Sequence, residues 1–183
     1  MKIEVENVRK IQKHRYFSDD NKFNTQLYNK TIILLSEAYK NNSAETLLLM
    51  DNNTFNYRCT SQGNSDTVMF DDKMIGALLD INNVSTFTAI HNHPNDDDFS
   101  LGDLKQLLIY KKISTLVLIT NSCKHSAFLY KTYKLNNSIQ GKIITKILNF
   151  MIDKDIVNMH HSALKLIQYM QRLGLIYLYY INY

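Results

Sequence analysis

The pattern of apolar and polar positions along the chain predicts a mixed sheet flanked by helices. Short runs rich in aliphatic, β-branched and aromatic residues, bounded by polar turns, are typical of strands. They lie at 45–50, 54–60, 84–90, 115–120 and 126–130. Apolar residues at helical spacing predict helices over 22–41, 74–79, 101–108, 139–151 and 156–170. The expected fold class is therefore α/β, with one mixed α+β sheet and helices packed against it.

The same pattern divides the chain into three parts. Residues 1–21 are mostly charged and polar, and they fit either a short strand or a loosely docked N-terminal arm. Residues 22–134 hold the predicted strands and make one domain. Residues 135–183 form a C-terminal extension with two amphipathic helical stripes and an aromatic tail. These stripes are expected to pack on the domain or to form a homodimer.

Composition narrows the class of protein. At 183 residues, with 45% hydrophobic and 21% charged residues, the chain is an ordinary globular domain with appendages. The net charge of +4 permits nucleic-acid binding but does not indicate it. Two cysteines are too few for a disulfide framework and fit a reducing compartment. Neither a signal peptide nor a long apolar run is seen, so we expect a cytoplasmic protein without a membrane span.

The chemistry of the chain is concentrated between residues 84 and 103. Side chains alternate along a strand, so His91 and His93 at the end of the third run share a face. Pro94 ends that strand, Ser100 is a helix N-cap, and Asp103 falls in the first helical turn. A strand end that meets a helix start would gather His91, His93 and Asp103 around one zinc ion, with the fourth position left for water. Taken alone, Ser100 and Asp103 would more often be a capping box than a part of a metal site.

These residues carry a family resemblance. His91-x-His93-Pro94 followed by Ser100-x-x-Asp103 resembles the motif of the JAMM (JAB/MPN) metalloproteases. Asn92 between the histidines is similar to the RadC branch and to phage- and toxin-associated JAB domains. The interval between the second histidine and the serine is one residue shorter here than in the better-known members. The resemblance implies a JAB/MPN-like, cytidine-deaminase-like core over 22–134, serving as a metal-dependent hydrolase domain.

The resemblance also assigns roles to further residues. Glu45, at the start of a strand ahead of the histidines, matches the catalytic glutamate and would shuttle a proton. Glu37 on the preceding helix is the competing candidate. Ser100 would hydrogen-bond the developing oxyanion.

Three functions follow from these expectations. The first is a JAMM-type zinc metallopeptidase or isopeptidase that cuts a peptide or a ubiquitin-like conjugate. The second is a RadC-like or phage-associated factor that works near DNA. The third is a catalytically silent interaction module on the same fold, which binds partners through its C-terminal stripes.

Overall fold

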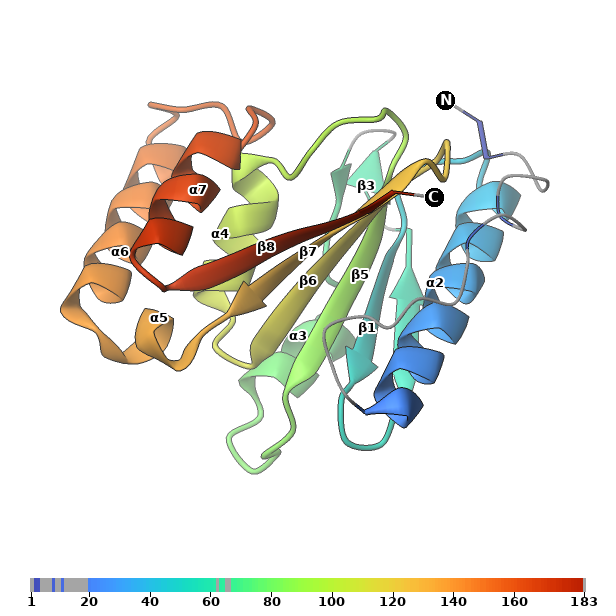
Figure 1. Cartoon of the computed structure of the whole chain (residues 1–183), viewed down its shortest axis with the longest axis horizontal. Helices are drawn as coiled ribbons and strands as arrows, with labels where there is room; N and C mark the ends of the chain where they lie inside the picture. The colour runs from blue at the N-terminus through green and yellow to red at the C-terminus, as the bar shows by residue number, and fades with distance from the viewer. Residues whose placement is uncertain are drawn as a thin grey trace.

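A six-stranded sheet runs through the middle of the molecule (Figure 1). The computed structural model describes residues 2, 3, 8, 11, 20–61, 63–64 and 67–182. The strand order is β2-β1-β5-β6-β7-β8, in which β5 and β6 are parallel and all other neighbours are antiparallel. The strands are β1 (Leu47–Asp51), β2 (Tyr57–Thr60), β5 (Phe87–His93), β6 (Ile113–Thr120), β7 (His125–Lys131) and β8 (Ile176–Asn182), with β3 (Gly63–Asn64) and β4 (Thr67–Val68) in a separate pair. The mixed sheet expected from the sequence is confirmed.

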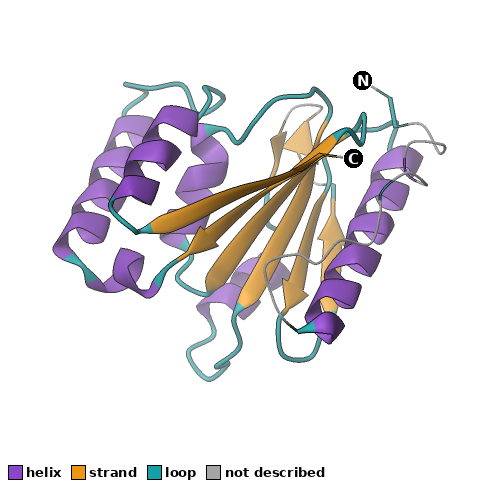
Figure 2. Ribbon diagram, in the orientation of Figure 1, coloured by secondary structure: helices purple, strands orange, loops and turns teal. Residues whose placement is uncertain are grey.

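Helices cover both faces of this sheet, as Figure 2 shows. One face packs against α2 (Asn21–Lys40). The other packs against α3 (Asp72–Leu79), α4 (Leu101–Ile109), α6 (Ile139–Asp153) and α7 (Leu164–Arg172), and the short α5 (Tyr133–Asn137) leads into α6. The expected class, a mixed sheet flanked by helices, is therefore correct.

Strand alternation produces two separate cores. On β5, Phe87 and Ala89 face the layer of α3, α4, α6 and α7, whereas Ile90 faces α2. Because His91 and His93 continue the series begun by Phe87 and Ala89, their side chains also point toward the α4 side. The hydrophobic pattern of one strand thus decides which face receives the imidazoles.

The connection between β5 and β6 places the chemistry at one end of the sheet. Parallel neighbours need a crossover connection, and α4 supplies it here. The chain leaves β5 at His93, crosses a loop over 94–99, and enters α4 at Leu101. The carboxyl end of β5 and the amino end of α4 therefore meet at the same edge.

The C-terminal segment departs in part from the expected helical extension over 135–183. It is helical in α5, α6 and α7, but β8 then returns to the sheet and pairs along β7. The aromatic tail has the alternation of a strand, with Ile176 and Leu178 toward the α7 side and Ile181 toward α2. α7 also begins later than the predicted stripe at 156–170, because the backbone of Met159, His161 and Ala163 bonds to residues 99–102 at the start of α4 instead.

Most of the predicted N-terminal arm, residues 1–21, lies outside the described residues. Within it, Ile3 and Ile11 are buried in the core beneath α2. The backbone amide of Ile3 donates to Ser43 Oγ at 2.9 Å, which ties this segment to the turn after α2.

Among the described residues, none of the helices has the length and apolar character that a membrane crossing would require.

Candidate metal centre

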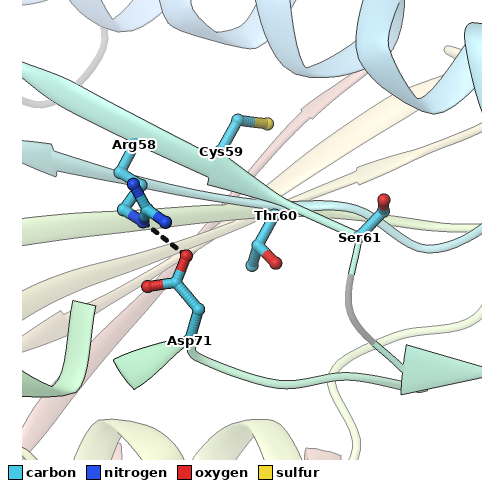
Figure 3. A pocket seen from close by; sticks show the side chains of 5 residues that line it. All are labelled: Arg58, Cys59, Thr60, Ser61 and Asp71. Carbon is cyan, nitrogen blue, oxygen red and sulfur yellow. Dashed lines mark hydrogen bonds and ion pairs between the residues drawn. The ribbon is translucent and has the colours of Figure 1, made fainter. Parts of the chain in front are cut away.

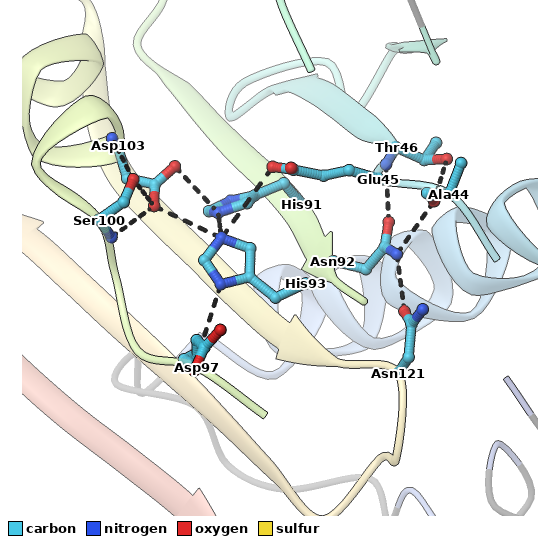
Figure 4. A network of polar contacts seen from close by, with 10 residues as sticks. All are labelled: Ala44, Glu45, Thr46, His91, Asn92, His93, Asp97, Ser100, Asp103 and Asn121. Atoms are coloured by element: carbon cyan, nitrogen blue, oxygen red, sulfur yellow. Dashed lines mark hydrogen bonds and ion pairs between the residues drawn. The ribbon is translucent and has the colours of Figure 1, made fainter. Parts of the chain in front are cut away.

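Four ionisable side chains meet where β1, β5 and α4 come together (Figure 4). His91 and His93 come from the end of β5, and Asp103 comes from the first turn of α4. Glu45 lies two residues before β1, whose first residue Leu47 pairs directly with His91. One potential ligand atom from each of the four residues lies within 4.8 Å of all the others.

The distances place three of these side chains, His91, His93 and Asp103, close together and Glu45 further away. His91 Nε2 and His93 Nε2 are 3.1 Å apart. Asp103 lies 3.2 Å from His91 Nε2 through Oδ1 and 3.5 Å from His93 Nε2 through Oδ2. Glu45 Oε1 is 4.0 Å from His93 Nε2. The two imidazoles and one carboxylate therefore converge on a point, with a second carboxylate beside it.

The two imidazoles are oriented in different ways. His93 Nδ1 lies 3.2 Å from the carbonyl of Asp97, a contact that directs Nε2 toward the cluster. His91 is only 1% exposed, and its Nδ1 makes no hydrogen bond within the described part of the chain. Its ring packs against Phe99, with centroids 6.1 Å apart. Packing sets the orientation of His91, and a backbone contact sets that of His93.

Mutual attraction changes the pKa values of two groups in the cluster. Burial alone would lower the pKa of His93, but the Asp103 carboxylate, aided by Glu45 and the Asp97 carbonyl, raises it above its usual value. Burial alone would raise the pKa of Asp103, but the imidazoles of His91 and His93 hold it well below its usual range. The aspartate is thus kept ionised and ready to bind a cation.

Ser100 and Asp103 form the capping box that the sequence allowed. Asp103 Oδ2 accepts from the Ser100 amide at 2.8 Å, and Ser100 Oγ accepts from the Asp103 amide at 3.1 Å. The Ser100 hydroxyl also donates to Asp103 Oδ2 at 2.7 Å. The capping function and the ligand position therefore coexist, since Oδ1 of Asp103 remains directed at His91. The oxyanion role predicted for Ser100 stays a prediction.

The segment between α6 and α7 closes the start of α4, and nothing in the sequence pattern indicated this. The Leu101 amide donates to the His161 carbonyl and the Gly102 amide to the Met159 carbonyl, both at 2.8 Å. With the capping box, these contacts satisfy all four amides that a helix start leaves without an intrahelical partner. The C-terminal extension therefore stabilises the helix start that positions Asp103.

From the sequence, Asn92 was expected to point away from the histidines, and it carried the resemblance to the RadC branch. It is fully buried on the opposite face of β5, where its side chain contacts the backbone on both sides of Glu45. Strand alternation predicts the direction in which Asn92 points, but not the segment that it meets.

The two candidate glutamates occupy different places. Glu45 is 6% exposed and lies in the cluster. Glu37 pairs with Lys40 at 2.7 Å on an exposed part of α2. The structure thus brings Glu45, and not Glu37, beside the histidines.

A hollow of about 340 Å³ lies on the outer strand β2, lined by polar residues (Figure 3). Thr60 in this hollow pairs with Leu47, and Leu47 pairs with His91. Directly paired residues point to the same face of a sheet, so Thr60 and His91 lie in one row, about 10 Å apart at two strand spacings. Arg58 and Asp71 form an ion pair at the rim. The sheet therefore carries a polar depression on the same face as the cluster of Glu45, His91, His93 and Asp103.

The donor set fits a metal ion. Nitrogen and oxygen ligands about 2.0–2.1 Å from a tetrahedral ion lie about 3.3–3.4 Å from one another. The 3.1 Å between the two imidazole nitrogens and the 3.2 Å between His91 Nε2 and Asp103 Oδ1 lie close to this spacing. These side chains, together with Glu45, could hold a metal ion with little movement.

Neither a protein-family model, nor a curated protein, nor a solved structure matches this chain.

Proposed function

We propose that the chain is a zinc-dependent hydrolase of the JAMM type that cleaves a peptide or isopeptide bond. The observation that supports this proposal is the convergence of Glu45, His91, His93 and Asp103 at the edge where β5 ends and α4 begins. The order of these residues along the chain matches the motif on which the family resemblance rests. On this proposal the central domain has the JAB/MPN-like, cytidine-deaminase-like core.

Zinc suits the donor set better than the harder cations. Imidazole nitrogens favour zinc over calcium and magnesium, which prefer oxygen ligands. Two histidines and one carboxylate are a known catalytic zinc set, in which a position is left open for water or substrate. His91, His93 and Asp103 would hold the ion, and Glu45, which stands further from His93, would remain outside the ligand set.

Hydrolysis can then be assigned to the residues of this chain. Zinc would supply Lewis acidity toward a carbonyl and lower the pKa of a water molecule. Glu45 accepts a proton from the attacking water, whose oxygen bonds to the carbonyl carbon. Glu45 then delivers that proton to the leaving amine as the carbon–nitrogen bond breaks. Ser100, at the N-terminus of α4, fixes Asp103 through the capping box. To donate to the oxyanion, its hydroxyl would have to turn away from Asp103 Oδ2.

The substrate class is a peptide or a ubiquitin-like conjugate. A chain-like substrate bound at the cluster could also reach the hollow at Arg58, Thr60 and Asp71, which lies on the same face about two strand spacings away.

Cleavage of quenched fluorescent peptides and of a linked ubiquitin-like substrate tests the proposal. We expect cleavage that a chelator abolishes and added zinc restores. Glu45→Gln should retain the metal and lose activity, since a neutral amide cannot take the proton. Cleavage that persists in chelator, or an unchanged rate in Glu45→Gln, would refute the proposal. Zinc binding without cleavage of any substrate would favour the silent interaction module instead.

A further inference from the structure

Two buried asparagines lie behind the metal centre, on the α2 side of the sheet. Asn92 and Asn121 are both 0% exposed. Asn92 Nδ2 donates to Asn121 Oδ1 at 2.7 Å, so the two amides form one unit (Figure 4). The backbone N–H of Asn121 also donates to the backbone carbonyl of His93 at 3.0 Å. This pair, which we call the asparagine clamp, is therefore anchored to the strand that carries both histidines.

The asparagine clamp grips the backbone on each side of Glu45. Asn92 Oδ1 accepts from the Thr46 amide at 2.8 Å, and Asn92 Nδ2 donates to the Ala44 carbonyl at 3.2 Å. Asn121 Nδ2 donates to the carbonyl of Ser43 at 2.8 Å. Side-chain amides thus hold the peptide groups before and after Glu45. In Figure 4, Glu45 extends away from these contacts toward His93.

The gripped segment belongs to no helix or strand, and backbone hydrogen bonds from Ser43 to Ala38, from Ala44 to Asn41 and from Asn92 to Thr46 also hold it. α2 ends at Lys40 and β1 starts at Leu47, so Glu45 lies in the connection between them. Asn42 and Ser43 in this connection have φ values of 56° and 62°, in the left-handed region that non-glycine residues seldom adopt. A backbone in this conformation persists only where its surroundings hold it.

We propose that Asn92 is a positioning residue that sets the carboxylate of Glu45 for proton transfer through the asparagine clamp. The inference rests on the proposed function, because it assigns Asn92 a purpose in the same reaction. Fixing the peptide groups on both sides of Glu45 fixes the direction of its Cα–Cβ bond. A misplacement of about 1 Å near the reacting atoms costs about 100-fold in rate.

Asn92→Asp is the sharpest variant, because it preserves the shape of the side chain, replaces the donating NH₂ group with an oxygen and, when ionised, adds a negative charge. The new carboxylate can still accept from the Thr46 amide. It has no N–H to donate, however, so the contacts to the Ala44 carbonyl and Asn121 Oδ1 become oxygen facing oxygen. Asn121→Ala is a second variant, for use if Asn92→Asp does not fold. It removes the hydrogen bond from Asn121 Nδ2 to the Ser43 carbonyl.

Asn52→Asp is the matched control. Asn52 follows β1 at its other end, where its amide donates to Thr86 Oγ1 and Ser114 Oγ, each at 3.0 Å. It also accepts from Thr88 Oγ1 at 2.8 Å. It therefore links the end of β1 to β5 and β6 through its side-chain amide, at the end of β1 remote from Glu45.

The experiment compares zinc content, kcat and unfolding in these variants and in the Glu45→Gln background. We expect Asn92→Asp to keep its zinc and lose about 10- to 100-fold in kcat. Asn52→Asp should lose stability while its kcat stays that of the parent. In the Glu45→Gln background Asn92→Asp should cause no further loss, because the group that it positions is already gone. An unchanged kcat in Asn92→Asp, or an equal further loss in both backgrounds, would overturn the inference.

A crystal structure of zinc-loaded Asn92→Asp tests the inference without activity. We expect the Glu45 carboxylate to move away from its position 4.0 Å from His93 Nε2, with His91, His93 and Asp103 unchanged. A Glu45 carboxylate that stays in place would overturn the inference. If Glu45→Gln cleaves as fast as the parent, the proposed function fails, and this structure still decides whether the clamp positions Glu45.

Discussion

Asp103 caps α4 and is also a proposed metal ligand. Two variants, Asp103→Asn and Asp103→Ala, separate these two roles. Its Oδ2 accepts from the amide and hydroxyl of Ser100 at 2.8 and 2.7 Å, while its Oδ1 faces His91 Nε2 at 3.2 Å. Asp103→Asn can retain one oxygen for the cap but replaces the other with an NH₂ group, which cannot bind a cation. Asp103→Ala removes the cap and the ligand together.

The magnitudes follow from these contacts. Without metal, Asp103→Ala should lower the free energy of unfolding by about 1–2 kcal/mol more than Asp103→Asn, the usual cost of losing a helix cap. With zinc at about 100 times its Kd, the parent should gain about 2.7 kcal/mol. For a chain of this size that corresponds to a Tm rise of about 5–11 °C. Both variants should lose this zinc-dependent rise.

Thermal unfolding, measured after chelation and again after zinc is added, provides the assay. A parent Tm that rises with zinc and variant Tm values that do not would support the ligand role. If Asp103→Asn keeps the full rise, Asp103 is not a ligand. If Asp103→Asn destabilises the metal-free protein as much as Asp103→Ala does, the reasoning about the cap is wrong.

Three further predictions concern regions outside the metal centre. Burial lowers the pKa of Lys131 to about 7 from its ordinary 10.5. Between these values the unfolded chain binds more protons, so the stability of the parent should rise with pH. Lys131→Met should therefore stabilise the protein by about 1–3 kcal/mol below pH 7 and progressively less toward pH 10.5. Urea unfolding across this pH range measures the difference, and a difference that does not change with pH would contradict the prediction. A Cβ on Gly141 would lie 2.0 Å from the Leu135 carbonyl oxygen. Gly141→Ala should therefore lower the free energy of unfolding by about 1–3 kcal/mol in the same assay, and an unchanged value would contradict this. The predicted homodimer through the C-terminal helices would bury exposed apolar residues of α6 such as Ile147, which is 53% exposed. Light scattering should then find a dimer for the parent and a monomer for Ile147→Asp. A monomeric parent would contradict the prediction.

The sequence predicted the sheet well because burial shows directly in side-chain periodicity. The run that ends in His91 and His93 is a buried strand, and the leucines after Ser100 form the buried side of α4. Alternation along the strand then gave the shared face of the two histidines, and helix-start chemistry gave Ser100 and Asp103. These features are local, so each can be read from a few neighbouring residues.

What the sequence did not predict depends on contacts between distant segments. The carbonyls of Met159 and His161 close the start of α4 from more than fifty residues away, and backbone groups leave no trace in the residue pattern. Asn92 and Asn121 meet the turn before β1 through side-chain amides, which short-range periodicity does not describe. The tail at β8 was read as aromatic rather than as a strand, because its partner β7 lies far from it along the chain.

The metal content of freshly purified protein tests the central claim most directly. If His91, His93 and Asp103 bind zinc together, elemental analysis should find about one zinc per chain in the parent and almost none in His91→Ala. A parent that carries no zinc when fresh, and takes up none on reconstitution, would contradict the account.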